Sequence, residues 1–396
     1  MPGPLHGYRV IECTTTITGP FASMILGDQG ADVIKVEAPG IGDVVRLLGT
    51  ARGGMSALFA LLNRSKRSVV LNLREERGRD LLRRLVAGAD VFIQNFRPGV
   101  VERLGIDEPS LREVRGDLIY VSISAFGPEG PYAHKPAYDH ILQGITGVAA
   151  VQRDRKTGRP QHVRHTLCDK VTALTAAQGV TAALLARERG QGGQHLRMNM
   201  LDASIAFLWP DGGANATILE EDAVLTPTLA SSYRVDDAAD GHYCVAALTD
   251  AQAHGFFRVL GHPELCSDPR FETLPARMQH IAELIELLGA GTPEPRPRAE
   301  VIAALEAEDV PCGPVYRSVG EVPGDPQVRA NGSFVDTVHP QLGRMREPRP
   351  PLRFDRTPAA IQGPAPALGA HTDEVLRELG LDAAEIEELR GEGVVS

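Results

Sequence analysis

The chain has 396 residues, of which 43% are hydrophobic and 23% are charged, and its formal net charge is −10. This is ordinary globular composition, so extensive disorder is not expected, and the acidic balance argues against a general nucleic-acid binder. Because 396 residues exceed one ordinary core, we expect one large domain together with a smaller one, or a split domain.

The first third of the chain alternates β-rich runs with helical patterns. Helices are expected from about Pro20 and over residues 75–88, and the β-rich runs are residues 8–13, 32–38, 68–73, 90–96 and 117–124. This order is typical of a parallel sheet with crossover helices, which places the chain in the α/β class. Each run is almost continuously apolar, so we expect helices to cover both faces of the sheet.

The lengths and types of the predicted elements change in the second half of the sequence. Helices are expected around residues 137–150 and 169–188, and a glycine turn at 190–194 leads into a strand. Shorter, mixed α and β segments from about 225 to 325 indicate a second domain. Residues 347–369 are too rich in proline for a helix or a central strand, so they are expected to run as an extended tether before two short helices.

Nothing in the sequence indicates export or a membrane span. The start "MPGPLHGYRVIEC" lacks the charged end and continuous apolar stretch of a signal peptide. The most apolar long segment, 171–187, is interrupted by polar residues and falls short of the roughly 20 apolar residues that a membrane helix needs. The five cysteines are scattered without a C-x-x-C pair, as is typical of reduced thiols. We therefore expect a cytoplasmic protein without membrane or nucleic-acid partners.

Basic residues recur at or just after the predicted strand ends and favour an anionic, nucleotide-like ligand. In an open α/β sheet, ligands collect beyond the carboxyl ends of the strands, where guanidinium groups bind phosphate oxygens. The segment "NFRPG" (95–99) combines an amide, an aromatic ring and a guanidinium at one such end. No G-x-G-x-x-G follows the first strand, which argues against an NAD-dependent enzyme. The basic residues are Lys35, Arg46, Arg64, Lys66, Arg67, Arg74, Arg97 and Arg103.

Asp169 stands at the head of the long apolar helix and has two interpretations. As an N-cap it would accept a backbone N–H and stabilise the fold by about 1 kcal/mol. Alternatively, its carboxylate at the positive end of the helix is a nucleophile. The residues alone favour the cap. The segment "HVRH" (162–165) lacks a third metal ligand, and no G-x-S-x-G elbow is present, so metal and serine chemistry are not indicated.

Six segments, in order and at similar spacing, resemble the family III coenzyme A transferases, which include formyl-CoA, carnitine-CoA and bile-acid-CoA transferases and the α-methylacyl-CoA racemases. The segments are "LHGYRVIECTTTITGPFASMILGDQGADVIKVEAPGIGD", "NRSKRSVVLNL", "NFRPGVVERLG", "SISAFGPEGPYAHKPAYDHILQGITG", "DVPCGPVYRSVGEV" and "PAPALGAHTDEVLRELG". The resemblance implies a doubly wound, Rossmann-like large domain, a small α+β domain and an interlocked homodimer. Large-domain residues 1–200 and 326–396, linker 201–224 and small domain 225–325 fit that arrangement.

The resemblance also implies a mechanism and a site. Asp169 corresponds to the family's nucleophile, which forms a mixed anhydride and then an aspartyl-CoA thioester, so that no ATP, NAD or metal is required. Where the family often has a basic residue, this chain has Ala38, so one phosphate or adenine contact is either missing or supplied by Lys35. The other CoA contacts implied are Thr16, Leu71, Arg74, Asn95, Phe96, Arg97, Arg103, Leu104 and Met200.

Departures from the family pattern narrow the reaction. The racemases carry a His-Asp pair where this chain has Tyr138 and Asp139, and tyrosine, with a reference pKa of about 10, is a poor proton carrier. Racemase activity is therefore disfavoured, although His140 lies next to the pair. Ile17 replaces a glutamine of the formyl-CoA transferases, and residues 226–236 lack their glycine-rich flap. We expect Ile17, Tyr138 and Asp139 to contact a carboxylic acid other than formate or oxalate, with succinyl-CoA as donor. A CoA-binding subunit without chemistry is the remaining alternative.

Overall fold

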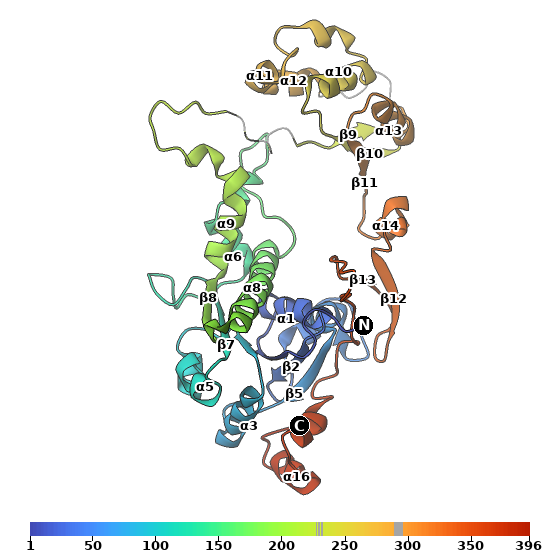
Figure 1. Ribbon diagram of the computed structural model, residues 1–396. Helices are drawn as coiled ribbons and strands as arrows, with labels where there is room; N and C mark the ends of the chain where they lie inside the picture. Colours follow the sequence, from blue (N-terminus) through green and yellow to red (C-terminus); the bar gives the residue numbers. More distant parts are fainter. Residues whose placement is uncertain (227, 229, 231–232, 289–295) are drawn as a thin grey trace. The chain divides into compact units, whose positions relative to one another are not determined.

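The computed structural model describes residues 1–226, 228, 230, 233–288 and 296–396, and its internal contacts divide the chain into two units. The large unit comprises residues 1–207 and 332–396, and the small unit comprises residues 208–331. Figure 1 traces the chain through both units. Both ends of the sequence therefore belong to one unit, with the small unit inserted between them.

A six-stranded parallel sheet forms the centre of the large unit, as the sequence predicts. Its order is β5-β2-β1-β6-β7-β8, so that the third, second and first strands along the chain precede the fourth, fifth and sixth. This is the doubly wound order, which reverses direction between β1 and β6. The strands are β1 (Arg9–Cys13), β2 (Asp32–Glu37), β5 (Lys66–Val70), β6 (Val91–Gln94), β7 (Ile119–Ser124) and β8 (His195–Asn199).

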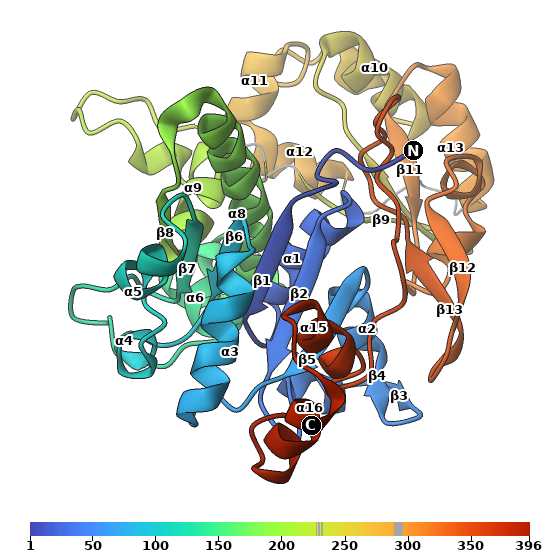
Figure 2. The same cartoon turned by 60° about the horizontal axis from the view of Figure 1, so that its bottom comes forward.

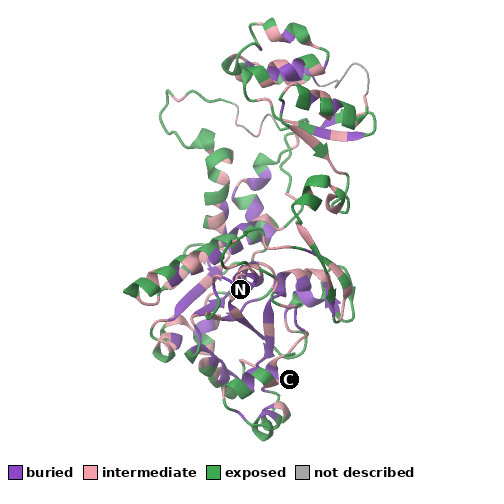
Figure 3. Cartoon of the chain, turned by 45° about the vertical axis from the view of Figure 1, so that its right-hand side comes forward, coloured by how far each residue is buried: buried purple, intermediate pink, exposed green. Residues whose placement is uncertain are grey.

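Helices cover both faces of this sheet because successive side chains of each strand point to opposite sides. Ile11 belongs to a core with α3 (Glu76–Ala87), α15 (Thr372–Glu378) and α16 (Ala383–Gly391). Its neighbour Val10 packs in a second core with α1 (Thr18–Asp28) and α8 (Leu167–Ala186). Figure 2 views the sheet from the side of α3 and α15, and Figure 3 shows its central strands as buried.

The remaining elements of the large unit lie in its connections and at its carboxyl end. Residues 349–371 contain no helix or strand. This stretch is joined to the segment before β5 by a hydrogen bond from Ser65 N to Gly363 O at 2.9 Å. The elements are η1 (Val44–Leu47), β3 (Ala51–Arg52), β4 (Met55–Ser56), α2 (Ala57–Asn63), α4 (Val100–Leu104), α5 (Glu108–Val114), α6 (Asp139–Ile145), α7 (Val148–Val151), η2 (Arg187–Gln191), β12 (Phe334–His339) and β13 (Gly343–Pro348).

The small unit has its own core, built around Tyr243, Phe257 and Phe271. Its antiparallel sheet has the order β11-β10-β9. Residues 226–236, where the flap was sought, lie partly outside the described residues. The elements, beginning with a helix that starts in the large unit, are α9 (Met200–Gly212), η3 (Ala214–Ala216), β9 (Asp236–Ala238), β10 (Gly241–Val245), α10 (Asp250–Val259), η5 (Pro263–Ser267), α11 (Leu274–Gln279), α12 (Ile281–Leu288), α13 (Arg298–Ala307), β11 (Cys312–Val315), η6 (Val322–Gly324) and α14 (Pro326–Ala330). Among the helices in the described ranges, none has both the length and the hydropathy to cross a bilayer.

Candidate active site

The carboxyl ends of β1 and β6 meet where the strand order reverses, and one side chain ties their two loops together. The Asn95 amide accepts a hydrogen bond from Thr15 N at 3.0 Å and donates one to Thr15 O at 2.9 Å. Doubly wound sheets bind their ligands in the crevice at this position. The geometry therefore directs attention to the loops after β1 and β6.

Lys35 lies beneath these loops and is not available to a ligand, so its expected role as a CoA contact is wrong. Its side chain is fully buried, and Nζ lies 2.8 Å from the Glu12 carboxylate and 3.1 Å from that of Asp43. Nζ also donates to Thr14 O at 2.8 Å. A charge removed from water needs such partners, and these partners fix the lysine in place.

The same buried network shapes the loop after β1. Thr16 has a φ of 76°, a left-handed conformation that is rare for a β-branched residue. Its N–H donates to the Asp43 carboxylate at 3.0 Å, and Lys35 in turn pairs with Asp43. Burial alone would raise the pKa of the Glu12 carboxyl, but the adjacent Lys35 and Lys66 cations hold it well below its usual range. Lys35 is thus a structural residue that holds the loop.

A cavity of about 690 Å³ opens at the carboxyl ends of β1, β2 and β5. Arg74 and Arg103 line it, and within the described part of the chain neither guanidinium has an ion-pair or hydrogen-bond partner. Two unpaired cations at one cavity favour a phosphorylated ligand. The predicted CoA contacts found here are Leu71, Arg74, Phe96, Arg103 and Leu104.

A second cavity, of about 340 Å³, lies beside the first and shares Thr15 and Phe96 with it. Asp169 lines this cavity, so a ligand that fills both can reach the carboxylate. Eight residues predicted for the site line it, namely Thr16, Ile17, Asn95, Phe96, Arg97, Tyr138, Asp169 and Met200. Thr18, which the sequence did not indicate, lines it as well.

Asp169 is not the helix cap that the residues alone favoured. Thr166 occupies the N-cap position of α8, and Asp169 is the third residue of the helix. Its Oδ1 accepts a hydrogen bond from the Thr18 hydroxyl. With 8% of its surface exposed, Asp169 has a pKa raised to about 6 by burial; Thr18 lowers this pKa and the Asp139 charge raises it.

Asp139 holds the backbone of Asp169 and is not among the residues that line the cavity, so its position does not support its expected role as a substrate contact. Only 6% of its surface is exposed. One carboxylate oxygen accepts from Asp169 N at 3.0 Å, and the other accepts from Gln143 Nε2 at 2.6 Å. The neighbouring Tyr138 does line the cavity and is 66% exposed.

Sequence reasoning missed several residues that line the small cavity, among them Thr18, His134 and Lys135. Thr18 begins α1, and His134 and Lys135 lie in the loop that follows β7. The signal for the last two was available, because a loop after a parallel strand lies at the ligand edge of the sheet. His140, which the sequence suggested as a proton carrier, is exposed and is not a lining residue of this cavity.

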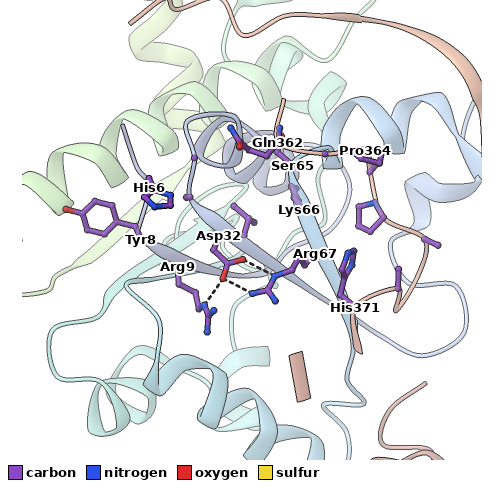
Figure 4. Close-up of a pocket in the computed structure, with 18 of the residues that line it drawn as sticks. His6, Tyr8, Arg9, Asp32, Ser65, Lys66, Arg67, Gln362, Pro364 and His371 are labelled. Carbon is purple, nitrogen blue, oxygen red and sulfur yellow. Dashed lines mark hydrogen bonds and ion pairs between the residues drawn. The ribbon is translucent and has the colours of Figure 1, made fainter. Parts of the chain in front are cut away.

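A larger cavity of about 890 Å³ lies at the opposite end of the sheet, where β1 and β2 begin. Its basic groups are already neutralised, because Arg9 and Arg67 both pair with Asp32, at 2.8 and 2.7 Å (Figure 4). Parallel sheets bind ligands at the other edge. The size of this cavity alone therefore does not mark it as the ligand site, whereas the unpaired arginines and the strand direction favour the opposite edge of the sheet.

Comparison with known proteins agrees with this fold. The sequence profile of CoA-transferase family III matches residues 5–372. Succinate–glutarate CoA-transferase of Agrobacterium fabrum is 35% identical over 387 residues, covering 95% of this chain and 96% of that protein. Acetyl-CoA:oxalate CoA-transferase of Acetobacter aceti is 36% identical over 341 residues, covering 84% and 86%. The crystal structure of a CAIB/BAIF family protein from Brucella suis aligns with a TM-score of 0.82 and 33% identity, covering 96% of this chain and all of that one.

The fold and the site thus define an α/β protein with a ligand crevice at the switch point of a doubly wound sheet. The chain belongs to CoA-transferase family III, as the resemblance in its sequence predicts. It is an enzyme of that family, and coenzyme A is carried by its substrates.

Proposed function

We propose that the enzyme transfers CoA from succinyl-CoA to a small dicarboxylic acid, with Asp169 as the covalent nucleophile. The observation that carries this proposal is the position of Asp169. Its carboxylate is buried, one oxygen is held by Thr18, and it lines the small cavity beside the cavity that holds two unpaired arginines. A nucleophile needs an ionised group close to the bound substrate, and a carboxylate with a pKa of about 6 is ionised at neutral pH.

CoA is proposed to occupy the 690 Å³ cavity, with its phosphates at Arg74 and Arg103. Phe96, on the boundary of both cavities, then guides the pantetheine arm towards Asp169. Asn95 has a positioning role here, since its amide already joins the loops after β1 and β6. Thr16, Leu71, Leu104 and Met200 complete the proposed contacts by their place in the two linings.

The chemistry proposed needs no further energy source. Asp169 attacks the thioester of the donor, giving a mixed anhydride and CoA thiolate. The thiolate then attacks the aspartyl carbon, the anhydride C–O bond breaks, and the products are an aspartyl-CoA thioester and the free carboxylate of the donor acid. The acceptor acid then repeats these steps in reverse order. Thioester and anhydride are both activated acyl groups, so the activation of the acyl carbon is kept throughout.

The acid is proposed to enter the small cavity, where Arg97 is a cation without a partner among the described residues. Ile17 and Tyr138 give the same cavity apolar surface, which suits the methylene chain of a dicarboxylic acid. Succinate and glutarate occur in the name of the Agrobacterium relative, and oxalate in that of the Acetobacter relative. Glutarate is therefore the first acceptor to test, and oxalate, which Ile17 in place of the formyl-CoA transferases' glutamine disfavours, serves as the contrasting acid.

The test follows both the product and the covalent enzyme. The wild type is incubated with succinyl-CoA and each acid, new acyl-CoA is measured by chromatography, and the peptide containing Asp169 is searched by mass spectrometry for a CoA adduct. Asp169→Asn is expected to lose both turnover and adduct, while the exposed control Glu129→Gln keeps both. Turnover by Asp169→Asn would refute the proposal, and α-proton exchange in D₂O without transfer would assign a racemase instead.

We further propose that the enzyme is a homodimer. Leu174 and Leu185 of α8 are 56% and 53% exposed, and Ile141 and Ile145 of α6 are 43% and 48% exposed. Two helices of one unit thus present apolar side chains that a second copy is proposed to cover. Light scattering after size-exclusion chromatography tests this, because an interlocked dimer is expected to show no folded monomer on dilution.

A further inference from the structure

Thr18 is buried against the proposed nucleophile. It is the first residue of α1 and only 3% exposed. Its hydroxyl donates to Oδ1 of Asp169, and among the residues that the structure describes its one other hydrogen-bonding contact is the Met200 sulfur, at 3.8 Å. Thr18 and Asp169 are 151 positions apart in sequence, so the fold itself brings the donor to this oxygen.

We propose that the Thr18 hydroxyl stabilises the oxyanion that forms on Oδ1 of Asp169 whenever the aspartyl carbon is attacked. This inference rests on the proposed covalent role of Asp169. The hydroxyl on Oδ1 leaves Oδ2, which no donor contacts within the described part of the chain, as the attacking oxygen. Thr18 therefore touches a reacting atom throughout the cycle.

The movement of electrons in each step shows where the hydrogen bond from Thr18 acts. Oδ2 attacks the acyl carbon of the donor thioester, the carbon–sulfur bond breaks, and CoA leaves as thiolate. The thiolate then attacks Cγ of Asp169, a carbon–sulfur bond forms, and the carbonyl electron pair moves onto Oδ1. When this intermediate collapses, the Cγ–Oδ2 bond breaks and the donor acid departs as a carboxylate that carries Oδ2.

The same oxyanion forms when the acceptor acid discharges the thioester. The carboxylate of the acceptor attacks Cγ, the charge again collects on Oδ1, and the carbon–sulfur bond breaks to release the thiolate. A hydrogen bond to Oδ1 strengthens in both steps because the oxygen changes from a carbonyl to an oxyanion. It does not favour the first attack, in which the carboxylate loses charge.

Backbone N–H groups at the start of a helix are common oxyanion donors, but the start of α8 does not offer the N–H of Asp169 for this purpose. That N–H donates to Asp139 at 3.0 Å. Asp139 thus occupies the donor closest in sequence, and Thr18 supplies one from a different helix. The side chain of Thr18 therefore supplies a hydrogen bond that the N–H of Asp169 does not.

Single-turnover kinetics of Thr18→Val, which keeps the shape and removes the hydroxyl, tests the inference. The enzyme is loaded with succinyl-CoA, freed from excess ligand, and mixed with the acceptor acid, and decay of the aspartyl-CoA thioester is followed by mass spectrometry. We expect thioester formation and its discharge both to slow by a factor of about 10² to 10³, the usual loss for one oxyanion donor. Thr18→Ser, which restores a hydroxyl, is expected to stay within a few-fold of the wild type.

The rate at which the thioester is discharged distinguishes this role from a simple effect on the ionisation of Asp169. In the thioester Asp169 has no carboxyl proton, so a residue that only tunes the ionisation of Asp169 leaves discharge at the wild-type rate. Normal discharge in Thr18→Val, or a Ser variant as slow as the Val variant, would overturn the inference. If the Val variant does not fold, Thr18→Ala replaces it in the same comparison with Ser. Absence of any thioester in the wild type would instead refute the proposed function.

Discussion

The buried carboxylate of Asp169 is expected to destabilise the folded chain, so that Asp169→Asn gains stability while it loses turnover. Burial raises the pKa of Asp169 from 3.8 to about 6. One pKa unit corresponds to about 1.4 kcal/mol, so the ionised carboxylate lowers the free energy of unfolding by about 3 kcal/mol at pH 8. Asparagine has nearly the same shape and does not ionise, so this loss is absent in the variant.

The sign of the pH dependence follows from the raised pKa. The folded state binds the proton more tightly than the unfolded state, so stability falls as the pH rises from about 4 to about 6 and stays low above that window. The difference between Asp169→Asn and the wild type is therefore expected to be about 3 kcal/mol at pH 8 and roughly half of that at pH 5.

Urea unfolding followed by circular dichroism at pH 5 and pH 8, with equal protomer concentrations, measures this difference. Glu129→Gln serves as the control, because Glu129 is exposed and surface substitutions usually change stability by no more than about 0.5 kcal/mol. An asparagine variant that is less stable than the wild type at pH 8, or a difference that does not shrink towards pH 5, would refute the reasoning.

Three further outcomes are expected. In pH profiles, kcat/KM falls about tenfold per pH unit below pH 6 as Asp169 becomes protonated, and Asp139→Asn moves this limb to lower pH because a like charge is removed; an unmoved limb would contradict the coupling. Arg103→Ala raises KM for succinyl-CoA about tenfold or more with little change in kcat, measured by initial rates against the exposed control Arg153→Ala. Lys35→Met lowers the free energy of unfolding by about 3 to 5 kcal/mol, because buried carboxylates lose their partner; a Lys35→Met variant with normal stability and a raised KM would restore the ligand role rejected above.

Much of the large unit follows from local sequence. Each apolar run that was assigned to the parallel sheet overlaps one of its strands, because continuous burial on both faces requires such runs. The run at 68–73 is displaced, since β5 begins two residues earlier, at Lys66. The α8 helix was expected at 169–188 and is observed at Leu167–Ala186. The two-residue shift matters because it moves Asp169 from the cap position into the first turn. Its carboxylate is then able to accept the hydrogen bond from the Thr18 hydroxyl.

The ligand-edge residues show where local reasoning ends. Lys35, Arg74 and Arg103 were indistinguishable in the sequence as basic residues near strand ends. Lys35 points into a buried network with Glu12, whereas the other two line a cavity without partners. Within a strand, the direction of a side chain depends on register, and its partners come from distant segments, so composition and spacing do not separate these cases.

The sequence by itself determined the class of fold, the parallel sheet and the family, because apolar periodicity and ordered motifs are written along the chain. Tertiary structure alone decided which charges are neutralised, which face the cavities, and that Thr18 meets Asp169. Those outcomes depend on contacts between residues far apart in sequence, and a contact of that kind exists only once the helices have packed on the sheet.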